Sequence, residues 1–434
     1  MKKLLVIGHT FPEPKTTAAG IRMMQLLDLF LAEGFDSNAE NFQITFATTA
    51  TGTERSADLQ AQNISIKNIL LNDSSFDGFA KELNPDVVIF DRYISEEQFG
   101  WRITENCPRA LKILDTEDLH FLRKAREEAI KKGESFSDTE LFTETAKREL
   151  ASILRCDLSL IISEYEMDLL QKTFAIKSEI LYYLPLFSED SPKEKPIPSF
   201  EARENFLAIG NLLHAPNVDA VLQLKSLWPK IKSQLPAVEL HIYGDYAPRQ
   251  ILELDNKQEG FRIMGWAEDV ERLMVSYRMQ LAPIRFGAGL KGKLLDAMHY
   301  GLPSITTQVG AEGLSGNLPF GGKIAFSNEE FINAAVQFYS DETLWKEAQQ
   351  NGFDIVQARF QKKNFNSPFK KRIKFLLENL EQHRRKNFIG QILQHHSLQA
   401  SKYMSKWIEV KNTLPQNASP VCYANSDEVR EEYK

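Results

Sequence analysis

The segment APIRFGAGLKGKLLDAMHYGLPSITTQVG, residues 282–310, holds the densest set of structural signals in the chain. A β-type run ends in its first residues, glycines follow at Gly287, Gly289 and Gly292, and a helical pattern covers Lys291–Tyr300. A glycine-rich turn from a strand into a helix exposes backbone N–H groups at the helix N-terminus, where the helix dipole favours negative charge. The segment therefore predicts a phosphate site at the carboxyl end of a strand.

Charged side chains stand close to this turn. Arg285, Lys291 and Lys293 would add positive charge to a bound phosphate. Asp296 follows Lys293 by three positions, which places the two on neighbouring positions of one helical face. Asp296 has two interpretations: it accepts hydrogen bonds from a sugar diol, or it is an ordinary solvated or capping carboxylate.

Two familiar phosphate motifs nearly match this segment, and neither is favoured. Gly287-x-Gly289-x-x-Gly292, with Glu312 twenty residues on, fits the dinucleotide fingerprint, but that motif belongs in the first βα turn of a domain. Here it follows the fourth expected strand of its domain. The same glycines resemble a P-loop, yet Leu294 replaces the Ser or Thr that would hold magnesium.

The N-terminal part of the chain alternates short apolar runs with helical patterns. The runs lack polar alternation, as expected of strands that helices cover on both faces. A helix is expected over 18–33, where Ile21, Met24, Leu27 and Leu31 recur at helical spacing. This order predicts a doubly wound parallel sheet. The expected strands are Leu4–Ile7, Ile44–Ala47, Val87–Phe90, Leu111–Leu114 and Leu158–Ile162.

A Pro-rich, charged stretch over residues 185–204 interrupts the alternation of strands and helices. Its composition predicts a linker between domains 1–184 and 205–360. The strand–helix order then restarts, with a helix expected over Asn217–Ser233. Two doubly wound domains joined by one linker would leave a central cleft between the carboxyl ends of both sheets. The expected strands of the second domain are Phe206–Ile209, Val238–Tyr243, Phe261–Met264, Gln280–Pro283 and Ser304–Thr306.

Residues 361–386 form a basic segment with an apolar stripe at helical spacing. Between Lys362 and Lys386 nine residues are basic and two are acidic. This C-terminal helix either packs its apolar stripe on the body of the protein or docks peripherally on anionic lipid at the inner face of the membrane. The remaining tail, 387–434, carries no functional signal. The stripe consists of Ile373, Leu376, Leu377 and Leu380.

Composition excludes several classes of protein. Hydrophobic residues at 43% and charged residues at 26% are typical of a globular protein rather than a disordered chain. A net charge of −7 argues against a dedicated nucleic-acid binder. The three cysteines Cys107, Cys156 and Cys422 are widely spaced, so they indicate reduced thiols in a cytoplasmic protein rather than a disulfide framework or a zinc site.

Four strings together resemble the retaining glycosyltransferases of family 4, which have the GT-B architecture. They are FLAIGNLLHAPNVDAV, VELHIYGD, FRIMGWAEDVERLM and FGAGLKGKLLDAMHYGLPSITTQVGAEGL. The resemblance spans most of residues 1–385 and implies two Rossmann-like domains facing a cleft. It also implies that a sugar moves, with retention, from a nucleotide-diphosphate sugar to an acceptor hydroxyl. No metal is expected, in agreement with the absence of an Asp-x-Asp motif.

The resemblance assigns donor-side roles. Asp296 matches the second acidic residue of the family's Glu-x7-Glu motif, which is expected to hold the donor ribose. The first acidic position falls on Ala288, and this departure leaves the contacts to the donor sugar open. Gly210 and Asn211 match the loop that faces the diphosphate, together with Gly287, Gly289 and Lys293. Gly265 and Trp266 match the segment beside the nucleobase, although Trp266 is equally compatible with a core position.

The resemblance also assigns roles in the first domain. His9, Thr10 and Gly20 belong to the expected acceptor-side loop after the first strand. His120 follows the strand Leu111–Leu114 and is expected to face the donor, although a lone histidine is often structural. Glu164 follows the next strand and either caps its helix or faces the cleft.

The mechanism expected from these parts is same-face attack by the acceptor hydroxyl, with a diphosphate oxygen as base. His120, Arg285, Lys291 and Asp296 are the expected catalytic residues, and the helix dipole and loop N–H groups would stabilise the leaving diphosphate. No cofactor is expected besides the nucleotide-diphosphate sugar, which is a co-substrate. The expected partner is a glycan or lipid-linked acceptor in surface polysaccharide synthesis.

Three other functions remain open from the sequence. The missing carboxylate at Ala288 suggests a catalytically silent GT-B protein that binds glycan or chaperones an active partner. A nucleotide-sugar epimerase or hydrolase would need a carboxylate or histidine pair near the anomeric carbon. An NAD-dependent oxidoreductase is the least favoured, because the glycine motif stands at the wrong strand.

Overall fold

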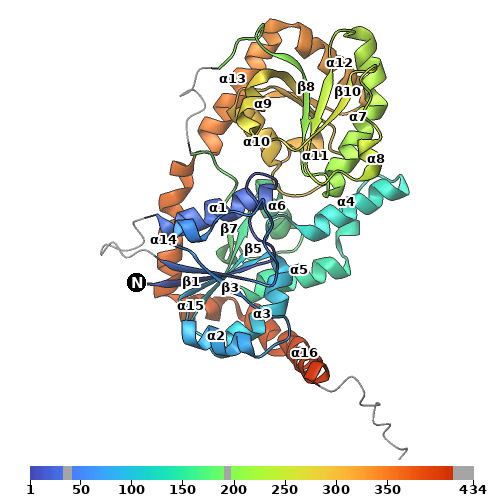
Figure 1. Cartoon of the computed structure of the whole chain (residues 1–434). Helices are drawn as coiled ribbons and strands as arrows, with labels where there is room; N and C mark the ends of the chain where they lie inside the picture. The colour runs from blue at the N-terminus through green and yellow to red at the C-terminus, as the bar shows by residue number, and fades with distance from the viewer. Residues whose placement is uncertain (33–41, 190–196, 414–434) are drawn as a thin grey trace, which may run out of the picture.

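The structure is a computed structural model that describes residues 1–32, 42–189 and 197–413. Two α/β domains lie one above the other, and the C-terminal helices return to the first domain (Figure 1). Each domain contains one parallel sheet with helices on both faces. The two doubly wound domains predicted from the sequence are therefore confirmed.

The first domain has a seven-stranded sheet in the order β3-β2-β1-β4-β5-β6-β7, with every neighbouring pair parallel. The order reverses next to β1, so the carboxyl ends of β1 and β4 flank a switch point where ligands bind in such folds. The strands are β1 Lys3–Gly8, β2 Gln43–Thr48, β3 Ser65–Asn68, β4 Val87–Asp91, β5 Leu111–Asp115, β6 Leu158–Ile161 and β7 Leu181–Tyr183. The helices are α1 Ala18–Leu31, α2 Ser75–Leu83, α3 Arg92–Asn106, α4 His120–Lys132, α5 Glu144–Arg155 and α6 Glu164–Lys172.

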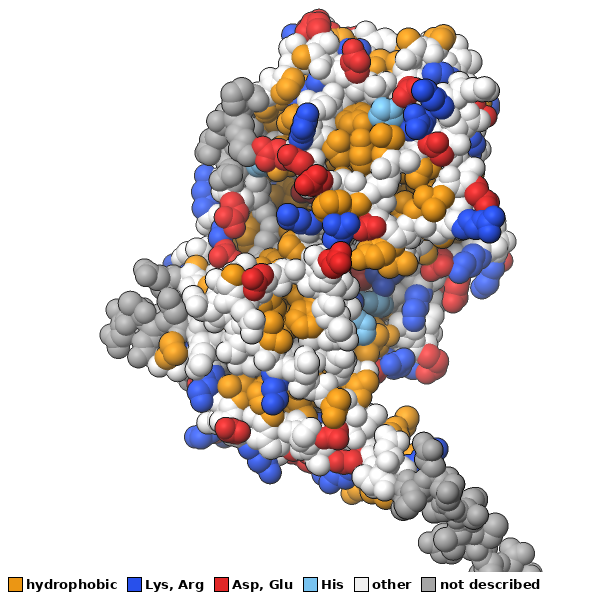
Figure 2. Space-filling view, viewed as in Figure 1, with side chains coloured by type: hydrophobic (Ala, Val, Ile, Leu, Met, Phe, Trp, Pro, Cys, Tyr) orange, Lys and Arg blue, Asp and Glu red, His pale blue; other side chains and the backbone are white. Residues whose placement is uncertain are grey.

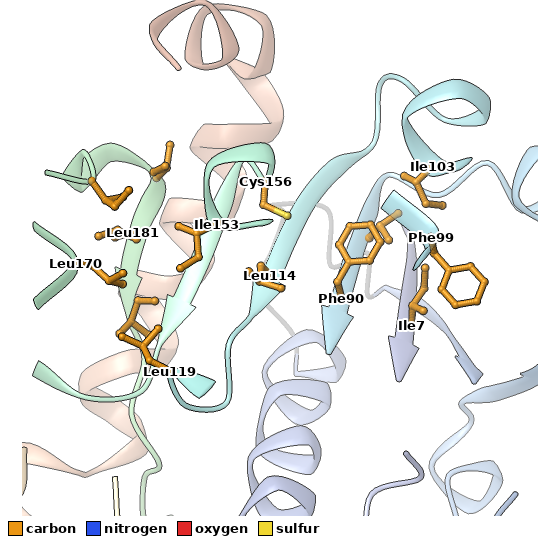
Figure 3. Close-up of a cluster of buried hydrophobic side chains, with 14 of the residues drawn as sticks. Ile7, Phe90, Phe99, Ile103, Leu114, Leu119, Ile153, Cys156, Leu170 and Leu181 are labelled. Carbon is orange, nitrogen blue, oxygen red and sulfur yellow. The ribbon is translucent and has the colours of Figure 1, made fainter. Parts of the chain in front are cut away.

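The continuous apolar strands are buried because helices cover both faces of this sheet. On one face, Ile7, Phe90 and Leu114 pack against Phe99 and Ile153 of the helices (Figure 3). On the other face, a second hydrophobic cluster contains the strand residues that alternate with those of the first cluster. Burial on both faces explains why these strands show no polar alternation.

The second domain has a six-stranded parallel sheet in the order β10-β9-β8-β11-β12-β13. Its strands are β8 Glu204–Ile209, β9 Leu240–Tyr243, β10 Phe261–Gly265, β11 Tyr277–Ala282, β12 Ser304–Thr307 and β13 Gly322–Ala325. Its helices are α7 Ala215–Gln234, α8 Arg249–Leu252, α9 Val270–Ser276, α10 Gly292–His299, α11 Gln308–Ala311, α12 Asn328–Ser340 and α13 Glu342–Arg359.

The sequence analysis missed three strands, namely β3, β7 and β13. All four residues of β3 are exposed at the sheet edge, so no apolar run marks this strand. β7 has three residues and β13 begins with a glycine, both too weak to read as strands. The strand expected over Gln280–Pro283 instead covers Tyr277–Ala282, because Pro283 lacks the N–H that a ladder requires.

The chain crosses between the domains twice, which corrects the expectation of one linker. The first crossing lies in the segment after β7 and the second lies after α13. The two run side by side, because the Ser188 amide donates to the Phe360 carbonyl (2.6 Å) and the Lys362 amide donates to the Ser188 carbonyl (2.9 Å). Much of the expected linker, residues 190–196, lies outside the described residues.

The basic segment contains two helices, α14 Lys362–Glu378 and α15 Leu380–Lys386, where one was expected. Ile373 and Leu376 are fully buried in the first domain, where they join Phe369 and Phe30 in one cluster. The apolar stripe is thus covered by the protein's own core. Leu377 and Leu380 are partly buried against the same cluster. The structure therefore supports packing of the stripe on the protein, and it gives no support to a membrane contact through residues 362–386.

The last described helix, α16 Phe388–Thr413, packs on α3 and α5 of the first domain. Cys107 and Cys156 are buried free thiols, and Cys422 lies outside the described residues. Within the part of the chain that the structure describes, no helix is long and apolar enough to cross a membrane.

Candidate functional site

A cleft of about 650 Å³ lies between the domains, at the carboxyl ends of both sheets. The first domain contributes the loop 14–19 and the residues that follow β4 and β5. The second domain contributes the loops after β8, β9, β10 and β11. The cleft therefore occupies the position that the doubly wound topology predicts for a ligand.

The glycine-rich loop after β11 forms the floor of this cleft. Gly287 and Gly289 have φ values of 151° and 65°, which L side chains rarely adopt. A Cβ atom at Gly289 would lie 2.9 Å from the Cβ atom of Asp118 in the first domain, so glycine permits the two domains to approach. Ala288 also lines the cleft, and helix α10 begins at Gly292.

Hydrogen bonds through Asn217 connect Lys293 to the Gly210–Asn211 loop in the cleft. The Lys293 ammonium donates to the Asn217 side-chain oxygen at 2.6 Å, and the Asn217 amide group donates to the Asn211 carbonyl at 2.7 Å. A Cβ atom at Gly210 would lie 2.8 Å from the Lys293 Nζ atom. Burial, and then the neighbouring Lys291, lowers the pKa of Lys293 to about 8. Lys293 therefore keeps a proton at neutral pH and places positive charge in the cleft.

Asp296 lines the same cleft one turn further along α10. Burial raises the pKa of Asp296 to about 7. Among the described residues, no hydrogen bond or ion pair engages its carboxylate. An enclosed carboxylate that the protein leaves unpaired is suited to accept hydrogen bonds from a ligand hydroxyl.

Two of the expected catalytic cations have other roles. Arg285 does not line the cleft, because its guanidinium forms a two-bond ion pair with Asp219. Lys291 lines the cleft, but its ammonium donates to the Gly289 carbonyl at 2.9 Å and to the Ala288 carbonyl at 3.3 Å. Arg285 is thus corrected to a surface position, and Lys291 is corrected to a residue that closes the glycine loop.

His120 stands on the opposite wall of the cleft, at the start of α4. The buried Glu149 carboxylate accepts hydrogen bonds from the amides of His120 (3.1 Å) and Phe121 (3.0 Å). Its Oε1 atom also lies 3.3 Å from the His120 Nδ1 atom. Glu149 therefore caps the helix and orients the imidazole at the same time.

The sequence analysis missed Arg92 and Glu117, two strained residues in this wall. They follow β4 and β5, and their φ values are 68° and 63°. Non-glycine residues in this region carry strain of about 1–3 kcal/mol and are concentrated at functional sites. Burial, and then the neighbouring Asp115, raises the pKa of Glu117 to about 8. Their positions at strand ends were the signal available in the sequence.

The expected acceptor-side residues His9, Thr10 and Gly20 do not line the cleft. The loop residues 14–19 line it instead. A Cβ atom at Gly20 would lie 2.3 Å from the backbone carbon of Glu13, so Gly20 lets this loop fold against helix α1. Of the three positions, only Gly20 has a clear part in shaping this loop, and none of them faces the ligand space.

Trp266 lines the cleft, whereas Gly265 does not. The Arg55 guanidinium lies 3.7 Å from the centroid of the Trp266 ring, and the buried indole N–H has no hydrogen-bond partner in the described structure. Gly265 instead provides a left-handed turn, with φ 77°, before the tryptophan. A nucleobase that stacked on this ring face would have to displace Arg55.

Two buried contacts join the first domain to the glycine-rich loop. The Glu166 Oε1 atom accepts hydrogen bonds from the amides of Leu119 (2.9 Å) and Gly289 (2.8 Å). Arg126 donates to the Gly287 carbonyl at 2.8 Å and pairs with both carboxylate oxygens of Glu312. These contacts hold the loop against the first domain.

Glu164, for which two roles were open, pairs with Arg359 at 2.7 Å and does not line the cleft. Its carboxylate also stands in the first turn of α6, although no side-chain cap hydrogen bond forms there. In the described ranges, no group of three or more His, Cys, Asp or Glu side chains is placed to hold a metal ion.

Residues 203–341 match the family model described as glycosyl transferases group 1. Most of the second domain is therefore similar to this family. The matched range includes the glycine-rich loop, Lys293 and Asp296, so the predicted resemblance rests on the part of the chain that contains these residues.

One curated relative matches part of the chain. A protein of 44.6 kDa from the cps region of Klebsiella pneumoniae is 25% identical over 177 residues, which are 38% of this chain and 45% of that protein. The match therefore spans less than half the length of this curated relative.

Three solved structures share the two-domain arrangement. Sucrose-phosphate synthase from Thermosynechococcus elongatus has 15% identity and a TM-score of 0.64, covering 87% of this chain and 100% of that one. HepE of Anabaena, in complex with UDP-glucose, has 14% identity and a TM-score of 0.62 with the same coverage. TarM of S. aureus has 13% identity and a TM-score of 0.53, covering 69% and 58%. The predicted GT-B fold is confirmed.

Proposed function

We propose that this protein is a glycosyltransferase that moves a sugar, with retention and without a metal, from a nucleotide-diphosphate sugar to an acceptor hydroxyl. The observation that carries the proposal is a single cleft that unites the glycine-rich loop, the Lys293 ammonium and the unpaired Asp296 carboxylate. The product is a surface polysaccharide or related glycoconjugate, made from a glycan or lipid-linked acceptor in the cytoplasm.

The chemistry follows from the two walls of the cleft. Lys293 and the N-terminus of α10 stabilise the charge that develops on the leaving diphosphate. Asp296 accepts hydrogen bonds from the ribose diol. The acceptor enters against the wall of Arg92, Glu117 and His120, and its hydroxyl attacks from the face that the diphosphate leaves. A diphosphate oxygen takes the proton from that hydroxyl, so no protein nucleophile is needed.

The similar proteins support the choice of donor and pathway. HepE was crystallised with UDP and glucose and with UDP-glucose, and TarM with UDP and a GlcNAc-glycerol. The Klebsiella relative is encoded in a cps region. Uridine diphosphate sugars are therefore the first donors to test.

The raised pKa of Asp296 should make nucleotide affinity depend on pH. Because the pKa of Asp296 is about 7, the carboxylate that accepts the diol hydrogen bonds is mostly protonated at pH 6 and mostly ionised at pH 8. We expect the matching nucleoside diphosphate to bind wild type about tenfold more weakly at pH 6 than at pH 8. Calorimetry on wild type and Asp296→Asn checks this, after a thermal-shift panel of UDP, GDP, ADP, CDP, TDP and NAD has identified the base.

The nucleotide's own phosphate groups also titrate and contribute to the pH dependence of binding. In Asp296→Asn the side chain cannot titrate, so the pH dependence that remains in this variant comes from the nucleotide. The free protein provides a second measurement. A raised carboxyl pKa stabilises the folded state at low pH, and that stability is lost as the pH rises towards 7. Asp296→Asn should therefore gain melting temperature over wild type at pH 8 more than at pH 5. Equal pH profiles in wild type and variant would contradict the assignment.

His120 is expected to act on the transferred sugar rather than on the nucleotide. Its imidazole lines the cleft on the wall opposite Lys293, and Glu149 holds it in place. We expect His120→Ala to lower kcat about 100-fold and to change the dissociation constant of the nucleoside diphosphate less than threefold. A matching loss of nucleotide affinity would place His120 on the diphosphate instead.

A second candidate function is a nucleotide-sugar epimerase or hydrolase. It is favoured by Glu117, Asp118 and His120, three titratable side chains on one cleft wall. Incubating the nucleotide sugar without acceptor tests it, because free sugar or an inverted sugar would then form. If the nucleotide binds but no sugar is released or transferred, the catalytically silent glycan-binding function is supported.

A further inference from the structure

Helix α16 presents an apolar face to solvent. Tyr403 and Trp407 are 65% and 62% exposed. The exposed apolar residues of the helix fall in two groups, 388–392 and 403–410, on the same side of the helix. Hydrophobic side chains reach the surface at the lower right of Figure 2, where this helix ends. The exposed apolar residues of α16 are Phe388, Ile389, Ile392, Tyr403, Met404, Trp407 and Val410.

The face of α16 that packs on the protein is small or polar. A Cβ atom at Gly390 would lie 2.0 Å from the Leu154 carbonyl oxygen. The Gln394 amide group donates to the Arg155 carbonyl at 2.6 Å, and the buried Ser405 hydroxyl accepts from the Arg102 guanidinium at 3.2 Å. The helix is therefore amphipathic in the opposite sense to an ordinary surface helix, whose apolar side faces the core.

The charge around this face selects one kind of partner. Helix α16 carries three lysines, Lys402, Lys406 and Lys411, against one acidic residue, whereas the whole chain has a net charge of −7. Of the three, Lys402 is paired with Glu105 of the first domain. Lys406 and Lys411 are exposed on α16 itself, and the Lys411 ammonium lies 5.2 Å from the centre of the Trp407 ring. Trp and Tyr between lysines, on a long apolar helical face, are typical of helices that lie in the interface of an anionic bilayer.

We propose that α16 docks the protein on an anionic phospholipid surface, with the helix axis parallel to the membrane. The two groups of exposed apolar residues, from Phe388 to Val410, span about 33 Å at 1.5 Å per residue, which suits a flat surface better than a pocket. A second copy of the chain would bring two cationic faces together, which like charges oppose. The helix lies on the side of the first domain away from the second domain (Figure 1), so the proposal is independent of the reaction in the cleft.

Flotation with vesicles tests the proposal on the full chain. Vesicles of phosphatidylglycerol and phosphatidylcholine are compared with vesicles of phosphatidylcholine alone, for wild type and for Tyr403→Ser/Trp407→Ser. We expect wild type to bind the anionic vesicles, and the double variant to bind them at least tenfold more weakly. Lys406→Glu/Lys411→Glu should lose at least as much. Phe326→Ser is the matched control, because Phe326 is 67% exposed on the second domain, and this variant should bind like wild type.

Trp407 also provides a spectroscopic measurement. Trp101, Trp228 and Trp345 are buried, and Trp266 lies in the cleft away from α16. A blue shift of the emission on adding vesicles should therefore come from Trp407, and Trp407→Phe should abolish it. All of the substituted side chains on α16 are exposed, so melting temperatures should stay near that of wild type. Equal binding by wild type and Tyr403→Ser/Trp407→Ser, or no binding to anionic vesicles, would overturn the proposal. So would a dimer in solution that the same substitutions dissociate.

Discussion

Replacing Lys293 with methionine is expected to lower kcat by about 10²–10³-fold, which is the cost of removing one fixed donor from a developing oxyanion. Lys293 places its ammonium in the cleft, and Asn217 holds it there at 2.6 Å. Methionine keeps the length and the apolar contacts of the stem but removes the charge. Because the proposed role is strongest when charge develops on the leaving diphosphate, kcat should fall more than the affinity for the nucleotide sugar. Release of nucleoside diphosphate in the presence of acceptor measures this.

The matched control for Lys293→Met is Arg285→Met. Both residues are basic and belong to the same segment, but Arg285 is paired with Asp219 outside the cleft. We expect Arg285→Met to change kcat less than threefold. In addition, wild-type activity should decline above pH 8, where Lys293 loses its proton. An Arg285→Met variant as impaired as Lys293→Met would contradict the assignment of the stabilising charge to Lys293 alone.

The fold was predictable because its signals are local. Apolar runs such as Leu4–Ile7 and Val87–Phe90 have no polar alternation, and only strands covered on both faces are buried in this way. The edge strand β3, with all its residues exposed, gives no such signal. The direction in which α16 faces was also unpredictable. No functional signal was found over residues 387–434, and only the packing of Gly390 and Ser405 shows that the apolar residues of α16 point outward.

The site was predictable where one short segment forms it, as with Lys293 and Asp296 on α10. It was not predictable where distant segments meet. Arg285 was predicted to be catalytic because its ion-pair partner, Asp219, is 66 positions away in the sequence and could not be recognised from the local segment. Glu117 was missed because its left-handed backbone cannot be read from residue type. Which side chains reach the cleft depends on how the two domains pack, and that is decided by long-range contacts.

The Glu166→Leu substitution tests the most consequential of these contacts. Glu166 is fully buried, and its Oε1 atom accepts the amides of Leu119 in the first domain and Gly289 in the glycine-rich loop. Leucine cannot accept a hydrogen bond, so both amides would lose their partner. Each unsatisfied buried amide costs about 1–3 kcal/mol, and we expect the free energy of unfolding to fall by about 2–4 kcal/mol in total. Nucleotide affinity should fall at least tenfold, because the loop is no longer held against the first domain.

Glu166→Gln should be much milder, which separates the hydrogen bonds from the charge. Burial, and then the nearby Asp118, raises the pKa of Glu166 to about 8, so the side chain is mostly neutral at pH 7. Its Oε2 atom is buried without a hydrogen-bond partner in the described structure, which also favours the protonated form. Glutamine keeps an acceptor oxygen and is neutral at every pH. At pH 7 its nucleotide affinity should therefore be close to that of wild type. Its melting temperature should equal or exceed that of wild type, because at this pH wild type must release the Glu166 proton on unfolding.

The pH dependence of stability decides between these interpretations. A raised carboxyl pKa stabilises the folded state below the folded-state pKa, and this stability is lost as the pH rises from the unfolded value towards 8. Wild type should therefore lose melting temperature relative to Glu166→Gln between about pH 5 and pH 8, with little further change above pH 8. Glu164→Leu is the control on the same helix, because its exposed pair with Arg359 is worth about 0–1 kcal/mol. If Glu166→Leu were as stable and bound nucleotide as tightly as Glu164→Leu, the glycine-rich loop would not depend on the first domain.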